Sequence, residues 1–203
     1  SSGFCFGVKN AVDSAYKMID DYDGQSDLIM LGELTHNKSV VNQLQEGGFR
    51  IVNEASDVPA GSTVIIRAHG VTPQQKQVLA DKKCKVFDCT CPFVQKIHKI
   101  VRDWYNKGYE IIIAGTKGHP EVEGICGEAP NKVHVIGSVD EYKELKVDFE
   151  KTILISQTTF SAEEFKKICA FAKNQIANNQ IFGTICNTTT NRQSEAARIS
   201  AEV

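Results

Sequence analysis

Two patterns of apolar residues alternate along the chain. Short apolar runs are typical of strands that are buried on both faces. They occur at residues 28–31, 49–52, 63–66, 85–87, 110–114, 133–136, 152–155 and 181–185. Segments with apolar side chains at helical spacing lie around these runs, at residues 8–19, 38–46, 73–81 and 93–104. The alternation predicts an α/β fold, with parallel sheets flanked by helices.

Three cysteines stand at the same place in this pattern. Cys91 and Cys186 each follow a strand-like run, and Cys5, like them, precedes a helical segment. Their similar spacing predicts repeated units, each with a parallel four-stranded sheet and each opened by a cysteine. We expect units at residues 1–90 and 91–185, the start of a truncated third unit at 186–203, and pseudo-threefold symmetry around a central cluster site.

The residues beside these cysteines indicate how the helices begin. Pro92 fits the first position of a helix, where its missing N–H costs nothing. Cys91 is therefore expected at a helix N-terminus, where free N–H groups and the helix dipole favour a thiolate. Ser161 is expected to cap a further helix, with Glu164 completing a capping box. A last helix is expected at residues 195–203.

Polar residues follow the predicted strands in register. His36 and His119 each follow the first strand of a unit. His69 follows the third strand of the first unit, and Gln157 and Thr158 follow the third strand of the second. Ligands of parallel sheets bind beyond the carboxyl ends of the strands. We therefore expect one shared pocket between the units, with the cysteines beside it.

Composition narrows the class of protein. The 203 residues are enough to bury a sizeable core, and 41% hydrophobic with 24% charged residues is typical of a soluble globular protein. A net charge of -2 gives no electrostatic footprint for nucleic acid. No apolar run approaches the roughly 18 residues of a membrane span. The seven cysteines suggest a reducing compartment, which is the cytoplasm or a plastid.

Thiolates from three units could hold one metal centre. An iron–sulfur cluster normally takes four cysteines, so a three-cysteine set leaves one iron open to substrate. Zinc also accepts three protein ligands in catalytic sites. A lone cysteine is more often a small buried hydrophobe, and this interpretation is kept for Cys84, Cys126 and Cys169. Cys89 is placed in the wall of the pocket.

The histidines, like the cysteines, fall into a group with expected structural roles and a group of candidate functional residues. His98 and His134 fall within a helix and a strand, and structural roles are expected for them. His36, His69 and His119 fall in polar loops after strands. They suit an anionic ligand when protonated, and they can donate hydrogen bonds to phosphate in either state.

Glu121 lies two residues after His119, in what is expected to be a loop bounded by glycine and proline. It is either a solvated surface acid or a proton donor to a bound substrate. Thr158 and Gln157 could hold a hydroxyl group or relay a proton.

Seven stretches, taken together, resemble 4-hydroxy-3-methylbut-2-enyl diphosphate reductase, the IspH/LytB family of the non-mevalonate isoprenoid pathway. His-Pro-Glu-Val-Glu-Gly at residues 119–124 and the Cys-to-Gln segment at 186–193 are the specific ones. The others are shorter and lie at residues 3–8, 35–37, 68–71, 88–92 and 157–159.

The resemblance implies a 4Fe–4S cluster with three ligands, Cys5, Cys91 and Cys186, and one open iron that binds the substrate hydroxyl. It implies a two-electron, two-proton reductive removal of that hydroxyl, giving isopentenyl and dimethylallyl diphosphate. Ferredoxin or flavodoxin would supply the electrons. The family has a complete third unit that binds much of the diphosphate, so we expect this chain to be part of a longer enzyme.

The resemblance also implies roles for single residues. Glu121 would be the proton source, with Thr158 and His119 in its relay. The implied substrate-binding residues are His36, His69, His119, Gln157, Thr158 and Asn187.

Two other functions remain open from the sequence. One is a dehydratase like quinolinate synthase, which has a similar three-unit architecture and a three-cysteine cluster but lacks the 119–124 motif. The other is a zinc-stabilised α/β binding module without catalysis, which would be colourless.

Overall fold

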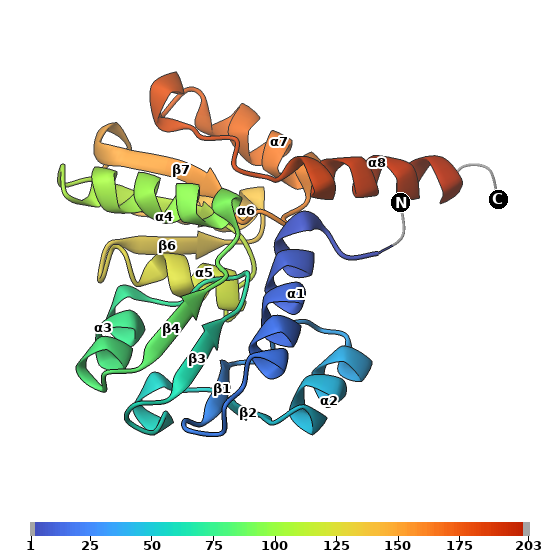
Figure 1. Cartoon of the computed structure of the whole chain (residues 1–203). Coiled ribbons are helices and arrows are strands. Elements are labelled where there is room, and N and C mark those ends of the chain that lie inside the picture. Colours follow the sequence, from blue (N-terminus) through green and yellow to red (C-terminus); the bar gives the residue numbers. More distant parts are fainter. Residues whose placement is uncertain (1–2, 201–203) are drawn as a thin grey trace. The chain divides into compact units, whose positions relative to one another are not determined.

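The computed structural model describes residues 3–200, which divide into two compact units, residues 3–95 and 96–200 (Figure 1). The division falls inside a helix, a few residues after the boundary predicted at residue 90. The assignment of residues 186–203 to a third unit stays a prediction. No helix among residues 3–200 is long and apolar enough to cross a membrane.

The first unit contains a four-stranded parallel sheet in the order β2-β1-β3-β4. The two central strands are apolar on both faces, because helices cover both of them. Helices α1 and α2 pack on one face, and α3 packs on the other. The elements are α1 (Phe6–Asp20), β1 (Leu28–Leu31), α2 (Lys38–Glu46), β2 (Phe49–Val52), η1 (Ala55–Asp57), β3 (Thr63–Ile66), α3 (Pro73–Asp81) and β4 (Lys85–Asp88).

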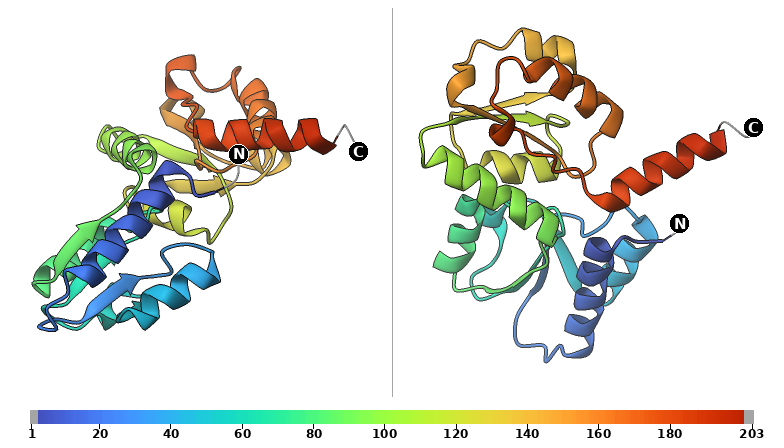
Figure 2. Two further views of the ribbon diagram at one scale, coloured as in Figure 1. Left: turned by 45° about the vertical axis from the view of Figure 1, so that its right-hand side comes forward. Right: turned by 90° about the horizontal axis from the view of Figure 1, so that it is seen from above.

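The second unit contains a parallel sheet in the order β6-β5-β7. Helices α4 and α5 pack on one face of this sheet, and α6 and α7 pack on the other. Helix α8 has no buried residue and extends away from its own sheet (Figure 2). The elements are α4 (Pro92–Tyr105), β5 (Glu110–Ala114), α5 (Pro120–Cys126), β6 (Val133–Ile136), α6 (Val139–Lys143), η2 (Phe149–Lys151), β7 (Thr152–Ser156), α7 (Ala162–Ala172), η3 (Asn178–Gln180) and α8 (Asn187–Ser200).

The second sheet has three strands, so the prediction of four strands in each unit is wrong for the second unit. The segment after η3 makes one isolated β-bridge, from Ile181 to Leu154, and no further ladder among the described residues. At Ser156 the hydroxyl of Thr184 replaces the missing strand. It accepts the Ser156 N–H at 2.8 Å and donates to the Ser156 carbonyl at 2.6 Å. The Thr184 side chain thus satisfies the N–H and the carbonyl of Ser156, which a fourth strand would otherwise have paired.

Two helices also differ from the expectation. Residues 120–126 form helix α5, where a loop was expected, because Pro120 occupies the first turn and His119 caps it. Helix α8 begins at Asn187, eight residues before the predicted start. The expected cap at Ser161 is present, with its Oγ accepting the Glu164 N–H at 3.2 Å. The Glu164 carboxylate lies 3.5 Å from the Lys167 Nζ. This ion pair is not part of the predicted capping box.

Candidate active site

Each of the three repeated cysteines immediately precedes a helix. Cys5 stands before α1, Cys91 before α4 and Cys186 before α8. Their carbonyl oxygens accept the first helical hydrogen bonds, at 2.9, 2.9 and 3.1 Å. All three are partly exposed, and none of them forms a disulfide among residues 3–200. The prediction that Cys91 lies at a helix N-terminus is confirmed, and the other two cysteines share this position.

Main-chain hydrogen bonds show that Cys91 and Cys186 are equivalent. The Cys91 N–H donates to the carbonyl of Ala68 at 2.9 Å, and the Cys186 N–H donates to the carbonyl of Thr158 at 3.0 Å. Ala68 and Thr158 each stand two residues beyond a third strand, β3 and β7. The repeat inferred from sequence spacing therefore extends to individual hydrogen bonds.

Within the first unit, α1 begins in contact with Cys91. A Cβ atom placed on Gly7 would lie 2.9 Å from the Cys91 Sγ, closer than such atoms approach. Only glycine allows this approach, so the first turn of α1, which follows Cys5, lies directly against Cys91.

His36 and His69 lie close together in the first unit. They follow the adjacent strands β1 and β3, and their ring centroids are 5.8 Å apart. His36 is exposed and His69 is half-buried. The sequence predicted that these histidines share one edge of the sheet, and the geometry confirms it.

Arg67 is a further cationic residue at this edge, directly after β3, and none of the sequence motifs assigns it a role. Its guanidinium lies over Gly32, where a Cβ would collide with Nη1, and its Nε is buried without a hydrogen-bond partner among residues 3–200. Burial lowers the pKa of Arg67, and the charge of Glu33 acts in the opposite direction. The signal available in the sequence was its position directly after a strand and two residues before His69.

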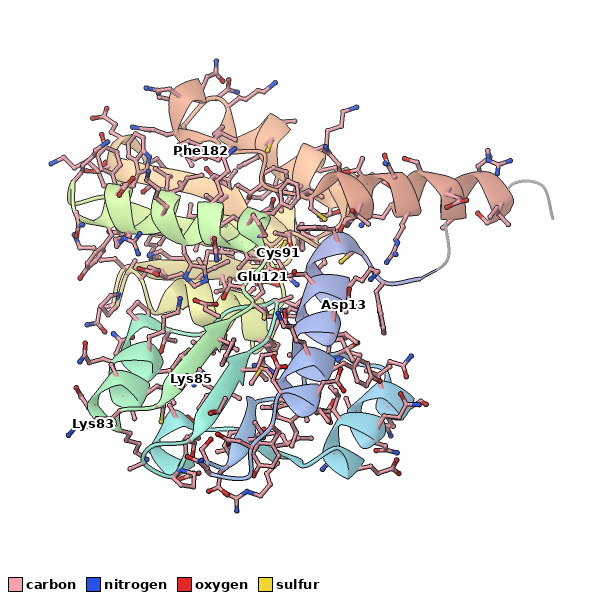
Figure 3. The ribbon with its side chains drawn as sticks, viewed as in Figure 1. Asp13, Lys83, Lys85, Cys91, Glu121 and Phe182 are labelled. Carbon is pink, nitrogen blue, oxygen red and sulfur yellow. The ribbon has the colours of Figure 1, made fainter. Side chains whose placement is uncertain are left out.

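Glu121 is a buried acid, not the solvated acid that was one of the two interpretations. It lies in the first turn of α5, in the interior of the second unit, with 1% of its surface exposed (Figure 3). Thr158 binds both of its carboxyl oxygens. The Thr158 N–H donates to Oε1 at 2.6 Å, and the Thr158 hydroxyl donates to Oε2 at 2.6 Å.

The protonation of Glu121 follows from these surroundings. Burial raises the pKa of the Glu121 carboxyl, because the charged form loses its hydration. The two hydrogen bonds from Thr158 and the charge of His98 lower it, but burial has the larger effect and the net shift is upward. Glu121 therefore holds its proton to a higher pH than an exposed glutamate does.

His119 contacts the main chain of Glu121. Its Nδ1 accepts the Glu121 N–H at 3.1 Å, which leaves the proton of the neutral ring on Nε2. Its predicted place in a proton relay stays a prediction.

Gln157 and Asn187 lie in different surroundings. Gln157 is buried, and its side-chain amide accepts the Thr116 N–H and donates to Thr159, so it braces two loops that follow strands. Asn187 is exposed at the start of α8. Substrate contacts for both residues stay predictions.

Three further cysteines have the surroundings of core residues. Cys89 is buried, and Cys126 and Cys169 are partly buried against hydrophobic clusters. Burial raises the pKa of each thiol, in the case of Cys126 to about 11. These thiols are kept protonated, which does not suit metal ligation.

Among residues 3–200, no three histidine, cysteine or acidic side chains come together as a ready-made metal site. Cys5 and Cys91 belong to one unit and Cys186 to the other. Three-cysteine ligation therefore stays a prediction. The donors themselves fit an iron–sulfur cluster, since each is a partly exposed cysteine side chain that directly precedes a helix.

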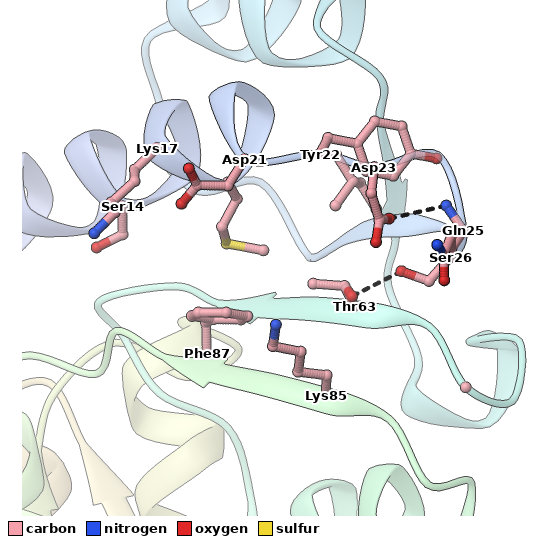
Figure 4. Close-up of a pocket in the computed structure, with 13 residues that line it drawn as sticks. Ser14, Lys17, Asp21, Tyr22, Asp23, Gln25, Ser26, Thr63, Lys85 and Phe87 are labelled. Atoms are coloured by element: carbon pink, nitrogen blue, oxygen red, sulfur yellow. Dashed lines mark hydrogen bonds between the residues drawn. The ribbon is translucent and has the colours of Figure 1, made fainter.

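A pocket of 690 Å³ lies elsewhere in the first unit, at the amino ends of β1, β3 and β4 (Figure 4). Side chains of both charges line it, among them Lys17, Asp21 and Lys85. His36, His69 and Cys91 follow the opposite, carboxyl ends of the same strands. The pocket is therefore separate from the candidate site.

Known proteins resemble the chain over its whole length. The LytB protein family matches residues 1–203. A 4-hydroxy-3-methylbut-2-enyl diphosphate reductase of Caldanaerobacter subterraneus is 39% identical over 206 residues, covering 100% of this chain and 70% of that protein. The protein of the same name from Clostridioides difficile is 38% identical over 204 residues, covering 100% of this chain and 72% of that protein.

Solved structures agree with these sequence matches. The E-1-hydroxy-2-methyl-but-2-enyl-4-diphosphate reductase from Plasmodium falciparum has a TM-score of 0.89 and 31% identity, over 98% of this chain. The chain spans 63% of that protein. A second structure, described as the terminal enzyme of the non-mevalonate pathway, has a TM-score of 0.80 and 33% identity, over 100% of this chain and 72% of that one.

Proposed function

Because the chain belongs to the LytB protein family, we propose that it acts as a 4-hydroxy-3-methylbut-2-enyl diphosphate reductase. The proposed reaction breaks the allylic C–O bond of the substrate. Two electrons and two protons are consumed, and the products are water with isopentenyl or dimethylallyl diphosphate. The observation that carries the proposal is the buried Glu121–Thr158 pair, which lies in two of the motifs that resemble the family and provides an acid away from water.

Cys5, Cys91 and Cys186 would hold the cluster in this proposal. When bound, a 4Fe–4S cluster with one open iron supplies electrons and a Lewis acid for the substrate hydroxyl. The protein contributes three thiols that each directly precede a helix, and the Thr189 N–H of α8 donates to the Cys186 Sγ at 3.4 Å. The tight approach of Gly7 to Cys91 fixes the start of α1 beside one of these thiols.

Glu121 would donate a proton to the departing hydroxyl. Its raised pKa keeps it protonated where an exposed glutamate would be ionised, and Thr158 fixes the orientation of its carboxyl group. In the protonated state the Oε2–H can donate to the Thr158 Oγ1, which frees the threonine hydroxyl for the substrate. General acid catalysis of this kind contributes roughly 10²–10⁴-fold to the rate.

Donors in the first unit would bind the diphosphate. His36 and His69 lie at one edge of the sheet, and each can donate to a phosphate oxygen. Arg67 follows the same strand as His69 and adds a permanent positive charge, and its buried Nε has no partner among residues 3–200. Charge-assisted hydrogen bonds of this kind are stronger than neutral ones.

The decisive experiment is an anaerobic assay of the intact protein, reconstituted with iron and sulfide, with the hydroxylated diphosphate and reduced ferredoxin or flavodoxin. We expect a brown protein that forms the two dehydroxylated diphosphates. A colourless protein, or a brown one that leaves the substrate unchanged, would contradict the proposal. A zinc-stabilised module would give the first of these outcomes. The donor and the cytoplasmic location stay predictions.

A further inference from the structure

Gln193 is the last residue of the 186–193 stretch that resembles the LytB family, and the proposed reaction gives it no role. It lies on α8, and its side-chain amide binds the main chain at the start of α7. Oε1 accepts the N–H of Ala162 at 3.0 Å, and Nε2 donates to the carbonyl of Phe160 at 3.0 Å. We call these two hydrogen bonds, which join α8 to the start of α7, the Gln193 clamp.

The segment that the clamp binds is anchored in the second unit. The side chain of Phe160 packs against the buried hydrophobic cluster between the sheet and α7. Thr158 lies two residues earlier, and its N–H and hydroxyl donate to the two carboxyl oxygens of Glu121, each at 2.6 Å. Gln193 therefore attaches α8 to the segment that holds the proposed acid.

Helix α8 depends on such attachments, because none of its residues is buried and it extends away from its own sheet (Figure 2). Packing therefore does not fix its direction. Its start is held by the Cys186 N–H, which donates to the Thr158 carbonyl at 3.0 Å. Gln193 lies seven residues later, about two turns and 10 Å along the helix and on the same face. Two attachments fix the direction of a helix, whereas the first alone would let it pivot.

The direction of α8 also affects the sulfur of Cys186. The hydroxyl of Thr189 lies 3.1 Å from Sγ, and the Thr189 N–H donates to Sγ at 3.4 Å. Both groups belong to the first turn of α8. A change in the direction of the helix therefore moves the sulfur relative to Glu121 and Thr158.

We propose that Gln193 is a positioning residue for the reaction: its clamp keeps the Cys186 sulfur at a fixed place relative to the acid. This inference rests on the proposed function, in which Cys186 is a cluster ligand and Glu121 is that acid. A misplacement of about 1 Å between reacting groups can cost roughly 10²-fold in rate. Gln193 acts through α8 and not by contact with the substrate.

The test is Gln193→Met in the intact, reconstituted protein, because methionine keeps the length and helix propensity of glutamine but forms neither hydrogen bond. Hydrogen exchange of the Ala162 amide should become faster, a result that needs no turnover. Single-turnover reduction should slow by roughly 10–10²-fold, with iron content and affinity for the diphosphate unchanged. Gln175→Met is the matched control, since Gln175 is exposed beyond the end of α7, and it should change none of these quantities.

Ala162→Pro breaks the clamp from its other side and separates positioning from stability. Ala162 is the first residue of α7, where proline is favoured, and Ser161 already has the extended conformation that a residue before proline requires. The variant lacks the N–H that Gln193 accepts, so turnover should slow while the unfolding midpoint is not lowered. It also decides the matter if Gln193→Met does not fold.

Unchanged exchange of the Ala162 amide in Gln193→Met would overturn the inference, because the clamp would then be absent in solution. A wild-type rate in Gln193→Met or in Ala162→Pro would overturn it as well. These outcomes presuppose an active wild type. An inactive wild type would instead contradict the proposed function, so the two failures are distinguishable.

Discussion

Burial and hydrogen bonding act on Glu121 in opposite directions, and the balance decides when it can donate a proton. Because its pKa is raised, the protonated form persists as the pH rises past the range of ordinary glutamates and is then lost. Turnover that depends on this proton should therefore fall on the alkaline side of the profile.

Glu121→Gln should reduce single-turnover reduction by roughly 10²–10⁴-fold, because the amide keeps the size of the side chain but has no acidic proton. Binding of the diphosphate should change little. Rapid-mixing measurements with the reduced protein give the rate, and calorimetry gives the affinity. A variant within a few-fold of the wild-type rate would remove Glu121 from the mechanism.

Arg67→Gln should weaken binding of the diphosphate and leave the proton step intact. Loss of a charge-assisted hydrogen bond costs about 1.5–3 kcal/mol, which is roughly 10–10²-fold in affinity. Arg50→Gln is the matched control, since Arg50 is 59% exposed and pairs with Asp27 before the start of β1. Equal affinities for both variants and the wild type would show that Arg67 does not contact the anion.

Single residues also show what the sequence could predict at the site. The spacing after strands was enough to bring His36 and His69 together, because strand order alone sets that position. The burial of Glu121 does not follow from residue spacing, since its contacts come from Thr158, which is distant in sequence, and only the family resemblance brought these two residues together. The helical start at Pro120 could have been predicted, because the same proline signal was used correctly at Pro92.

Among the elements, strands were easier to predict than the segment that replaces a strand. Apolar runs identified the seven strands within one residue at their ends, because buried parallel strands need apolar side chains on both faces. The run at residues 181–185 has the same appearance but forms only one bridge among the described residues. This segment differs from a strand because the Thr184 hydroxyl forms hydrogen bonds with the main chain of Ser156. The pattern of hydrophobic residues cannot predict such side-chain hydrogen bonds.

Thr184→Val should therefore destabilise the protein by about 1–3 kcal/mol, because it leaves the buried Ser156 main-chain groups without partners. Urea unfolding monitored by circular dichroism measures the change. Thr184→Ser, which keeps the hydroxyl, should retain most of the stability. If valine and serine have equal effects, the hydroxyl does not replace the strand.

In the whole molecule, the cysteines that open repeated units differ from the other cysteines. Replacement of Cys5, Cys91 or Cys186 by serine should strip most of the iron from the reconstituted protein. Cys126→Ser and Cys169→Ser should retain it, because burial keeps these two thiols protonated. Iron and sulfide analysis, with the visible absorption spectrum, distinguishes the two groups. Loss of the cluster from Cys126→Ser, or its retention in Cys91→Ser, would contradict the three-ligand assignment.

The main-chain bonds from Cys91 to Ala68 and from Cys186 to Thr158 do not involve sulfur. A variant that lacks either thiol keeps these bonds, so what it loses with the sulfur is the stabilisation that a bound cluster gives to the folded state. In a cell, where degradation follows the unfolded fraction, the abundance of such a variant should match that of the wild-type chain without its cluster. Added iron would then raise the level of the wild type and leave the level of the variant unchanged.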